Sequence, residues 1–294
     1  MNRTKIGKKQ LVSIYMPVFN ASKYLRQAIE SILNQTYTNF EFIIIDDAST
    51  DDSWKIIKSY AKRDKRIRAI QNPINLGHCI TCNIAISKAK SKYIAKMDAD
   101  DISFDTRIEK QMAYMLKHPK VVALGTQCIV IDKDDNIIGN KNFPTSTKES
   151  RDSIFWAIPI QHPTILMNTS KLPSDFRWYE PHLTSGEEVN VFFRFLLYGE
   201  ITNLPEDLFF YRHLDNSLSH INLKKSFYST IRARIGVLSL GFRPNIKSVL
   251  MNICQIIAIH IISPKLLNKI WYFIKGKKNL NLNLTVRTFA QSQV

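Results

Sequence analysis

The feature that most constrains the fold of this chain is a regular alternation of strand and helix patterns over its first 120 residues. LVSIYMPVF, starting at Leu11, is a nearly continuous apolar run, as in a strand buried on both faces. Ser22 can cap the helix that follows, whose apolar residues recur on one face. The same pair of patterns then recurs three times, with predicted strands at Phe40–Asp46, 67–71 and Tyr93–Asp98 and predicted helices near 54–61, 77–89 and 108–116. This succession predicts an α/β fold with a Rossmann-like, mostly parallel, doubly wound sheet.

The pattern changes after about residue 121. VVALGTQCIVID and IIGNKNF flank an Asp-Asn turn and predict a hairpin, QHPTILMN predicts a strand, EEVNVFFRFLLYG a helix, and ITNLPEDLFFYR an extended segment. From about Lys224 onward the pattern is helical and basic. We therefore predict one domain over 1–220, with a first half at about 11–120 and a second half at about 121–220. A basic, amphipathic helical region over 221–294 follows it.

Carboxylates cluster at the expected ligand-binding edge of the sheet. In open α/β sheets, ligands bind at the carboxyl ends of the strands, and two of the four predicted strands end in Asp46-Asp47 and in Asp98-Ala99-Asp100-Asp101. Like charges gathered on one edge repel and need a compensating cation or donor. The sequence contains no G-x-G-x-x-G and no G-x-x-x-x-G-K-[ST], so it lacks the glycine-rich phosphate cradles of dehydrogenases and P-loop kinases. A nucleotide diphosphate bound here would need a divalent ion, and Asp-x-Asp oxygens suit Mg²⁺ or Mn²⁺.

The motifs, taken together and in order, carry a family resemblance. MPVFN, IIIDDASTD, NLGH, KMDADD with Arg107 after it, and GEEVNVFFRFLLYG resemble the family-2 inverting glycosyltransferases of the GT-A fold. The resemblance covers about residues 11 to 220 and is strongest to bacterial enzymes that build lipopolysaccharide or capsule. It implies that 1–220 is a GT-A catalytic domain, with a nucleotide-sugar half at about 11–120 and an acceptor half at about 121–220. It implies transfer of a sugar, as UDP-hexose or UDP-N-acetylhexosamine, to a glycan or lipid-linked acceptor, with Mn²⁺ or Mg²⁺ as cofactor.

The resemblance also implies roles for individual residues. Phe19 would stack on the nucleotide base, usually uracil, beside Pro17, and Asp47 would accept a hydrogen bond from the base edge. Asp98 would contact the ribose, and Asp100 would hold the metal ion. The remaining nucleotide-sugar-binding candidates in these motifs are Asn20 and Asn75.

The family's catalytic base is the second residue of a Glu-Asp pair, and the matching pair here is Glu187-Glu188. Glu188 is therefore the expected base, although the extra methylene leaves both glutamates as candidates. A carboxylate within reach of the acceptor hydroxyl can take its proton during an inverting transfer. His213 matches a third metal ligand of some relatives, with packing or solvent exposure as the alternative. His162 could face the acceptor or be a structural histidine.

Two other functions compete with this hypothesis. A nucleotidyltransferase also uses aspartates and a divalent ion, but it normally begins with a glycine-rich basic loop that MPVFNASKY lacks. An inactive, membrane-associated glycan-binding scaffold is the non-enzymatic alternative, and the presence of Asp100 and Glu188 argues against it.

The C-terminal region is unusual in charge. From Asn216 to Val294 there are 12 Lys or Arg and no Asp or Glu, whereas the first 215 residues carry the remaining +4 of the +16 net charge. KSVLMNICQIIAIHIIS holds an apolar core about 15 residues long, interrupted by Asn252, Gln255 and His260, and this length is short of the ~20 residues needed to cross a bilayer. We expect a helix pair lying on an anionic membrane surface, with a helix packed on the catalytic domain as the alternative. Nucleic acid is not an expected partner.

The N-terminus and the cysteines point to the cytoplasm. The apolar run after the basic start is short, β-branched and without a cleavage site, so we expect a first strand rather than a signal peptide. Cys79 and Cys82 form a lone C-x-x-C, which predicts helix-face thiols in a reducing compartment rather than a zinc site. The expected location is cytoplasmic, peripheral on the inner face of the cell membrane.

Overall fold

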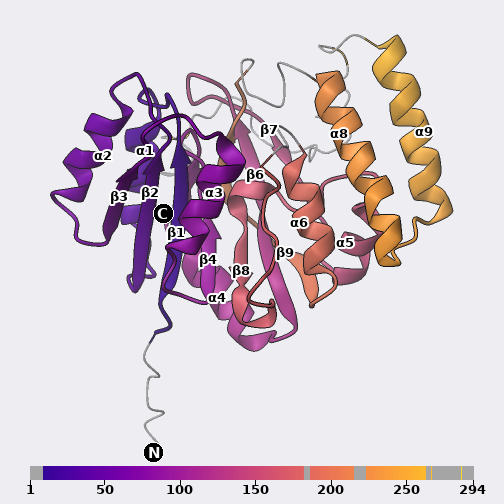
Figure 1. The fold of residues 1–294 in the computed structure, drawn as a ribbon, viewed down its shortest axis with the longest axis horizontal. Coiled ribbons are helices and arrows are strands. Elements are labelled where there is room, and N and C mark those ends of the chain that lie inside the picture. The colour runs from indigo at the N-terminus through magenta and orange to yellow at the C-terminus, as the bar shows by residue number, and fades with distance from the viewer. Residues whose placement is uncertain (1–8, 182–185, 215–222, 263–265, 267–285, 287–294) are drawn as a thin grey trace, which may run out of the picture.

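The computed structural model describes residues 9–181, 186–214, 223–262, 266 and 286, and these form an α/β fold around one continuous sheet (Figure 1). The described strands number nine, in the order β3-β2-β1-β4-β8-β6-β9-β5, with β7 paired to β6. The β3-β2-β1-β4 half is parallel throughout, whereas the second half is mixed. The predicted α/β class with a mostly parallel sheet is confirmed.

The parallel half consists of the four strands that the sequence predicts, which are β1 Val12–Val18, β2 Phe40–Asp46, β3 Ile67–Gln71 and β4 Tyr93–Lys96. All residues of β1 and β2 are buried, because helices cover both faces of this part of the sheet. Alternate β1 side chains point to opposite faces, so that Ile14 and Met16 join one core cluster and Tyr15 joins the other.

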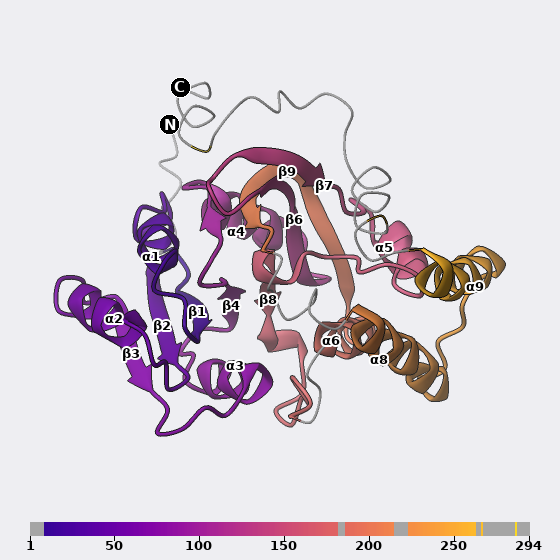
Figure 2. The same ribbon diagram turned by 90° about the horizontal axis from the view of Figure 1, so that it is seen from above.

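Helices form the two outer layers. The helices α1 Leu25–Leu33, α2 Ser53–Ala61 and α4 Arg107–Lys117 pack their apolar residues into the first cluster. The helices α3 His78–Ser87 and α6 Glu187–Phe195 pack on the second, and Figure 2 shows them on the side of the sheet opposite α1 and α4. Cys79 and Cys82 lie buried on α3, in the helix that was predicted for them.

The second half contains the predicted hairpin and several elements that we did not predict. The hairpin joins β6 Val121–Ile131 to β7 Ile137–Lys141, and β9 Glu200–Arg212 runs parallel to β6. The short strand β5 Ile102–Ser103 and the helix α5 Thr147–Ser153 show no clear periodicity of apolar residues in the sequence. The predicted strand at 161–168 is reduced to β8 Leu166–Asn168, with 3₁₀ turns at η1 His162–Thr164 and η2 Thr169–Lys171 on either side.

One helix cap was predicted wrongly. The helix α1 begins at Leu25 with Tyr24 at its N-cap, and no side chain caps it. The backbone N–H of Ser22 instead donates to Asp51 Oδ2 at 2.9 Å, because the loop after β1 is tied to the loop after β2. Because the two loops are far apart in the sequence, this contact could not be recognised from the residues next to Ser22.

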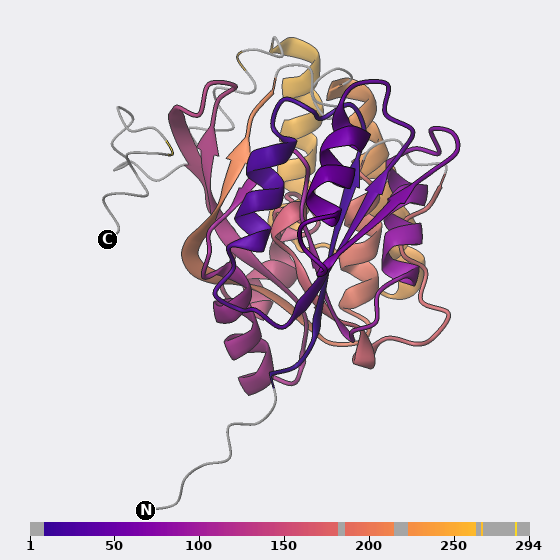
Figure 3. The same cartoon turned by 90° about the vertical axis from the view of Figure 1, so that its left-hand side faces the viewer.

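The C-terminal region forms a pair of helices at one end of the molecule. These are α8 Leu223–Gly236 and α9 Ile246–Ile261, joined through the 3₁₀ turn η3 Val237–Leu240. They lie side by side at the right of Figure 1, and in Figure 3 they stand behind the sheet, with α1 and α2 in front. Among the described residues, no helix is long and apolar enough to cross a membrane. The predicted boundary near residue 220 lies outside the described residues.

Candidate active site

The loops after β1 and β2 form one structure at the carboxyl edge of the sheet. The register pairs Val18 with Asp46, so both strands end at the same level. Asn20 Oδ1 accepts from the backbone N–H of Thr50 at 2.8 Å, and Asn20 N–H donates to Ser49 Oγ at 3.0 Å. Asn20 has φ +49°, a left-handed conformation that asparagine tolerates better than most residues. Asn20 therefore acts first as a brace between the two loops.

This brace leaves an aromatic ring on the surface. Phe19 precedes Asn20 and is 50% exposed, although a large apolar side chain is normally buried. Pro17 lies buried within β1, and Asn75 lies exposed in the loop after β3. The exposed Phe19 ring at the sheet edge is available for stacking on a planar ligand.

Asp47 organises the loop that follows β3. Its carboxylate accepts from the backbone N–H groups of Leu76 and Gly77, at 2.9 and 2.8 Å, and from the Asn72 amide at 2.7 Å. Burial raises the pKa of Asp47, but the hydrogen bonds from Leu76 and Asn72 outweigh it, and the pKa lies below its ordinary value. Asn72, which sequence reasoning did not select, is the partner that fixes this carboxylate.

The acidic loop after β4 is crowded with carboxylates. Burial and the neighbouring Asp98 raise the pKa of Asp100 to about 6. Burial, Asp100 and Asp98 also raise the pKa of Asp101. Asp101 Oδ1 accepts from the backbone N–H of Arg212 at 2.7 Å, whereas Oδ2 is buried without a hydrogen-bond partner. Burial and the repulsion between neighbouring aspartates thus both disfavour the ionised carboxylates of this loop.

Two buried cations lie beneath this loop. The Lys96 ammonium is fully buried and forms an ion pair with Asp98, whose side chain remains 28% exposed. Arg107 donates to Ser103 Oγ at 2.8 Å and to the backbone carbonyls of Lys96 and Pro163 at 3.2 Å. Burial lowers the pKa of Arg107 to about 10. Lys96 thus holds Asp98 from below and leaves part of its carboxylate facing outward.

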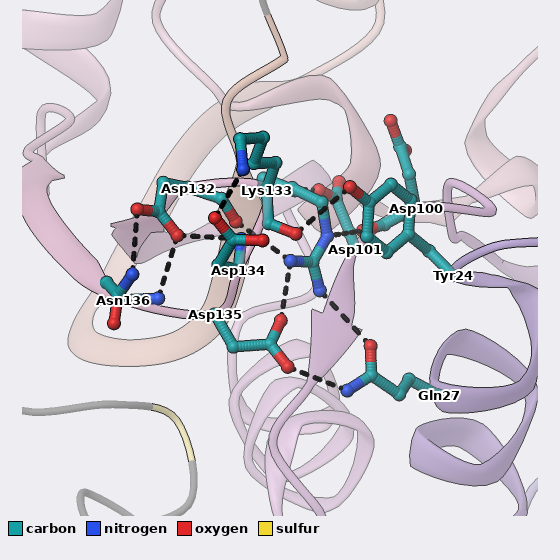
Figure 4. A network of polar contacts seen from close by, with 10 residues as sticks. Tyr24, Gln27, Asp100, Asp101, Asp132, Lys133, Asp134, Asp135 and Asn136 are labelled. Atoms are coloured by element: carbon teal, nitrogen blue, oxygen red, sulfur yellow. Dashed lines mark hydrogen bonds and ion pairs between the residues drawn. The ribbon is translucent and has the colours of Figure 1, made fainter.

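Arg212 connects the acidic loop to two other segments, the β6–β7 turn and the start of α1, and Figure 4 labels its partners there. Its Nε donates to the carbonyl of Asp100 at 2.8 Å, and Nη1 donates to Asp135 Oδ1 at 2.5 Å in the β6–β7 turn. Nη2 donates to Gln27 Oε1 on α1 at 3.3 Å, and the guanidinium lies 4.2 Å from the ring centroid of Tyr24. Sequence reasoning missed Arg212, because an arginine at a strand end usually faces solvent.

The two candidate base residues begin α6. Gly186 precedes them with φ +71°, and Glu188 is half-buried in the first turn of the helix. The side chain of Glu187 lies outside the described residues. A Cβ on Gly186 would lie 3.0 Å from Thr230 Oγ1, so α8 packs directly against the start of α6. Carboxylates are stabilised at a helix N-terminus by the macrodipole, which suits a base that must be ionised.

His162 belongs to a buried aromatic chain. Its Nε2 shares a hydrogen bond with Tyr179 Oη at 2.7 Å, and Tyr179 Oη shares one with Tyr15 Oη at 3.0 Å. Burial, Lys96 and His78 all lower the pKa of His162 well below its ordinary value, so the imidazole is neutral at pH 7. These contacts give His162 a structural role. His213, directly after Arg212, donates its backbone N–H to the carbonyl of Ile131 at 2.8 Å.

Comparisons with known proteins identify the family. Residues 13–172 match the profile described as "Glycosyl transferase family 2". An uncharacterized glycosyltransferase of Haemophilus influenzae is 32% identical over 220 residues, which are 72% of this chain and 68% of the relative. The chain belongs to glycosyltransferase family 2. It is a nucleotide-sugar-dependent glycosyltransferase.

Solved structures support the GT-A fold of this glycosyltransferase. S. aureus TarS 1-349 in complex with UDP-GlcNAc aligns with a TM-score of 0.61 at 19% identity, over 76% of this chain and 66% of that one. The mannosyltransferase PcManGT from Pyrobaculum calidifontis, in complex with GDP-Man and Mn²⁺, aligns with a TM-score of 0.58 at 13% identity, over 92% and 85% of the two chains. This level of identity relates the folds and not the substrates.

The residues of this glycosyltransferase fit a divalent cation at the acidic loop. Carboxylate oxygens are the ligands that Mg²⁺ and Mn²⁺ prefer, and a cation would offset the burial and the repulsion from Asp98 that together raise the pKa of Asp100. Within the described part of the chain, no group of three or more His, Cys, Asp or Glu side chains is arranged to hold a metal ion. His213 as a third ligand therefore stays a prediction, and phosphate oxygens of the donor would have to complete the shell.

The Asp47 hydrogen bonds lead to a stability prediction for this glycosyltransferase. Asp47→Asn should lower the free energy of unfolding by about 1–3 kcal/mol at neutral pH, because the amide replaces one acceptor atom with a donor. Since the folded pKa lies below 3.8, the carboxylate stabilises the fold above the unfolded pKa and loses this effect as pH falls through the folded pKa. The difference between wild type and variant, measured by urea unfolding, should therefore be constant near neutrality and shrink below about pH 4. A difference that stays the same at every pH would contradict this role.

Proposed function

We propose that this glycosyltransferase moves a hexose or N-acetylhexosamine from its UDP donor, with inversion, to a growing cell-surface glycan such as lipopolysaccharide, lipooligosaccharide or capsule. The observation that carries the proposal is the crowded, raised-pKa carboxylate loop beside the exposed Phe19 ring. The two lie close together because β1 and β4 are neighbours in the sheet, with Tyr15 opposite Lys96. In a nucleoside diphosphate, the nucleobase can stack on an aromatic ring and the diphosphate can bind through a cation held by carboxylates. The UDP-GlcNAc bound by TarS supports the choice of uridine.

In this proposal, Phe19 stacks on the uracil, and the loop braced by Asn20 and Asp47 forms the base pocket, with Asn75 exposed beside it. Asp98, held from below by Lys96, turns its exposed carboxylate oxygen toward the ribose. Asp100 is the carboxylate that would hold Mn²⁺ or Mg²⁺, with His213 as the proposed further ligand. The ion, when bound, would neutralise the charge that grows on the departing diphosphate.

The proposed catalytic base is Glu188. The acceptor hydroxyl attacks the anomeric carbon as the bond to the diphosphate breaks on the opposite face, so the configuration inverts. Glu188 takes the proton of that hydroxyl, so the proton that the acceptor loses ends on the carboxylate at the start of α6. Half-burial of Glu188 removes part of the competing water while leaving the carboxylate reachable.

We further propose that the enzyme works as a peripheral protein on the anionic cytoplasmic face of the cell membrane. The acid-free, cationic C-terminal region supports this location, because such a region favours anionic partners. Lipid-linked acceptors would be presented at the same surface.

Calorimetry with UDP and GDP, each with and without Mn²⁺, tests the donor side. We expect UDP to bind only when the metal is present and GDP to bind more weakly. A panel of UDP-sugars, followed by donor hydrolysis, would then identify the sugar. Preferential binding of GDP would overturn the uridine assignment. An absence of nucleotide binding and hydrolysis under all conditions would favour the inactive scaffold instead.

A further inference from the structure

The helix α9 is attached to the catalytic domain by its polar side chains. Ser248, Asn252 and Gln255 fall on one helical face and donate to the backbone carbonyls of Asp152, Phe155 and Trp156, at 3.2, 2.7 and 2.8 Å respectively. These carbonyls lie at and just after the end of α5, where helix carbonyls lack intrahelical partners. The polar residues that interrupt the apolar run thus satisfy backbone groups of the domain.

The contacts between α9 and α8 are polar as well. Arg234 donates to Asn252 Oδ1 at 2.9 Å, and Tyr228 Oη shares a hydrogen bond with His260 Nε2 at 2.7 Å. Near the end of the helix, Ile259 is buried. The inward face of α9 therefore carries Ser248, Asn252 and Gln255 together with the buried Ile259, whereas an ordinary surface helix turns its polar side chains to solvent.

The outward face of α9 is apolar. Its members recur at helical spacing along the whole 16-residue helix and are exposed at Ile246 (80%), Val249 (44%), Leu250 (56%), Ile253 (48%), Ile257 (52%) and Ile261 (79%). We call these six residues the α9 stripe. A contiguous exposed apolar row on a globular protein marks an interaction surface.

Charge indicates what the α9 stripe contacts. The two-helix unit and its linker also expose cations, at Lys224, Lys225, Arg232, Arg243 and Lys247. With no acid from Asn216 to Val294, this surface would repel a second copy of itself and attract an anionic partner. Exposed apolar residues in a unit that also exposes lysine and arginine match the boundary between lipid headgroups and acyl chains.

We propose that the α9 stripe is the membrane-docking surface of this enzyme and inserts shallowly into an anionic lipid bilayer, while its polar face stays bonded to the catalytic domain. This assignment rests on the proposed peripheral location and not on the sugar-transfer chemistry. Because α8 contacts α9 and also packs on Gly186 at the start of α6, docking ties the candidate base to the membrane surface.

Vesicle sedimentation of the full chain tests the docking surface. Wild type should partition onto vesicles that contain phosphatidylglycerol, and the double variant Ile253→Asp with Ile257→Asp should bind at least about tenfold more weakly, because charged side chains do not enter the acyl region. Leu116→Asp on α4 is the matched control, since Leu116 is an exposed apolar residue (56%) on a different helix, and its binding should equal wild type. Thermal unfolding checks that all variants fold.

Charge and salt give a second, independent test. Lys224→Glu with Lys225→Glu should also weaken binding, and high salt should weaken wild-type binding, since the Debye length falls from ~10 Å at 0.1 M to ~3 Å at 1 M. Equal binding of wild type and the Ile253/Ile257 variant would overturn the proposal. So would wild-type dimers that the same variant abolishes while no vesicle binding occurs, because the stripe would then contact a second copy. Donor hydrolysis in detergent-free solution should be the same in wild type and in every variant. If wild type also shows no donor hydrolysis, that result counts against the proposed function and leaves the docking result intact.

Discussion

Glu188→Gln is expected to lower kcat for sugar transfer by about 10²–10⁴, the usual cost of removing a general base. The amide keeps the size of the side chain and its place in the first turn of α6, but it cannot accept the proton of the acceptor hydroxyl. Affinity for UDP should hardly change, because Glu188 contacts the acceptor side of the site in the proposed mechanism. Steady-state kinetics with the identified donor, together with calorimetry for UDP, would measure the two effects separately.

Glu187→Gln is the matched control, since the two glutamates are adjacent. If Glu187→Gln shows the large loss and Glu188→Gln is nearly as active as wild type, the base is the first residue of the pair. If neither variant loses more than a few-fold, the base lies elsewhere in the chain.

Asp100→Ala is expected to abolish transfer and metal-dependent binding of UDP. The substitution removes a carboxylate from the proposed cation site, while the backbone carbonyl of residue 100 can still accept from Arg212, so the loop should keep its conformation. Because burial and Asp98 raise the pKa of Asp100 to about 6, its ionised form is unfavourable in the metal-free fold. The melting temperature without metal should therefore stay the same or rise.

Asp134→Ala controls for the loss of an acidic side chain near the same network. Asp134 lies in the β6–β7 turn with its side chain 57% exposed, and its removal should leave activity unchanged. Excess EDTA should reproduce the Asp100→Ala defect in wild type. Full turnover in Asp100→Ala, or undiminished wild-type turnover in EDTA, would exclude a metal role for this residue.

The sequence predicted best those features that depend on nearby residues. The nearly continuous apolar runs of β1 and β2 and the 3.6-residue periodicity of α4 can be recognised from neighbouring positions alone, and the structure confirms these elements. Acidic residues that directly follow β2 and β4 must lie at the carboxyl edge once the sheet is parallel. The position of Asp47 and Asp98 along that edge was thus accessible without coordinates.

The supporting residues of the site could not be predicted in this way. Lys96 and Arg107 are charged residues that the fold buries completely, and Asn72 is bound to Asp47 across 25 positions. Arg212 reaches Asp100 across 112 positions and Asp135 across 77. Each of these side chains compensates a charge or an unpaired group that exists only after distant strands have come together.

The orientation of α9 is the clearest feature that the sequence does not determine and the tertiary structure does. From the sequence alone, Ser248, Asn252 and Gln255 fall on one side of a helix and the α9 stripe on the other, and the amphipathic pattern is fixed by this spacing. The usual rule would place the apolar side against the domain. The domain instead presents backbone carbonyls at and after the end of α5, which need donors, and the amides of Asn252 and Gln255 supply them. The sequence therefore determined that α9 has two faces, and only the exposed carbonyls of a separate segment decided that the polar face turns inward.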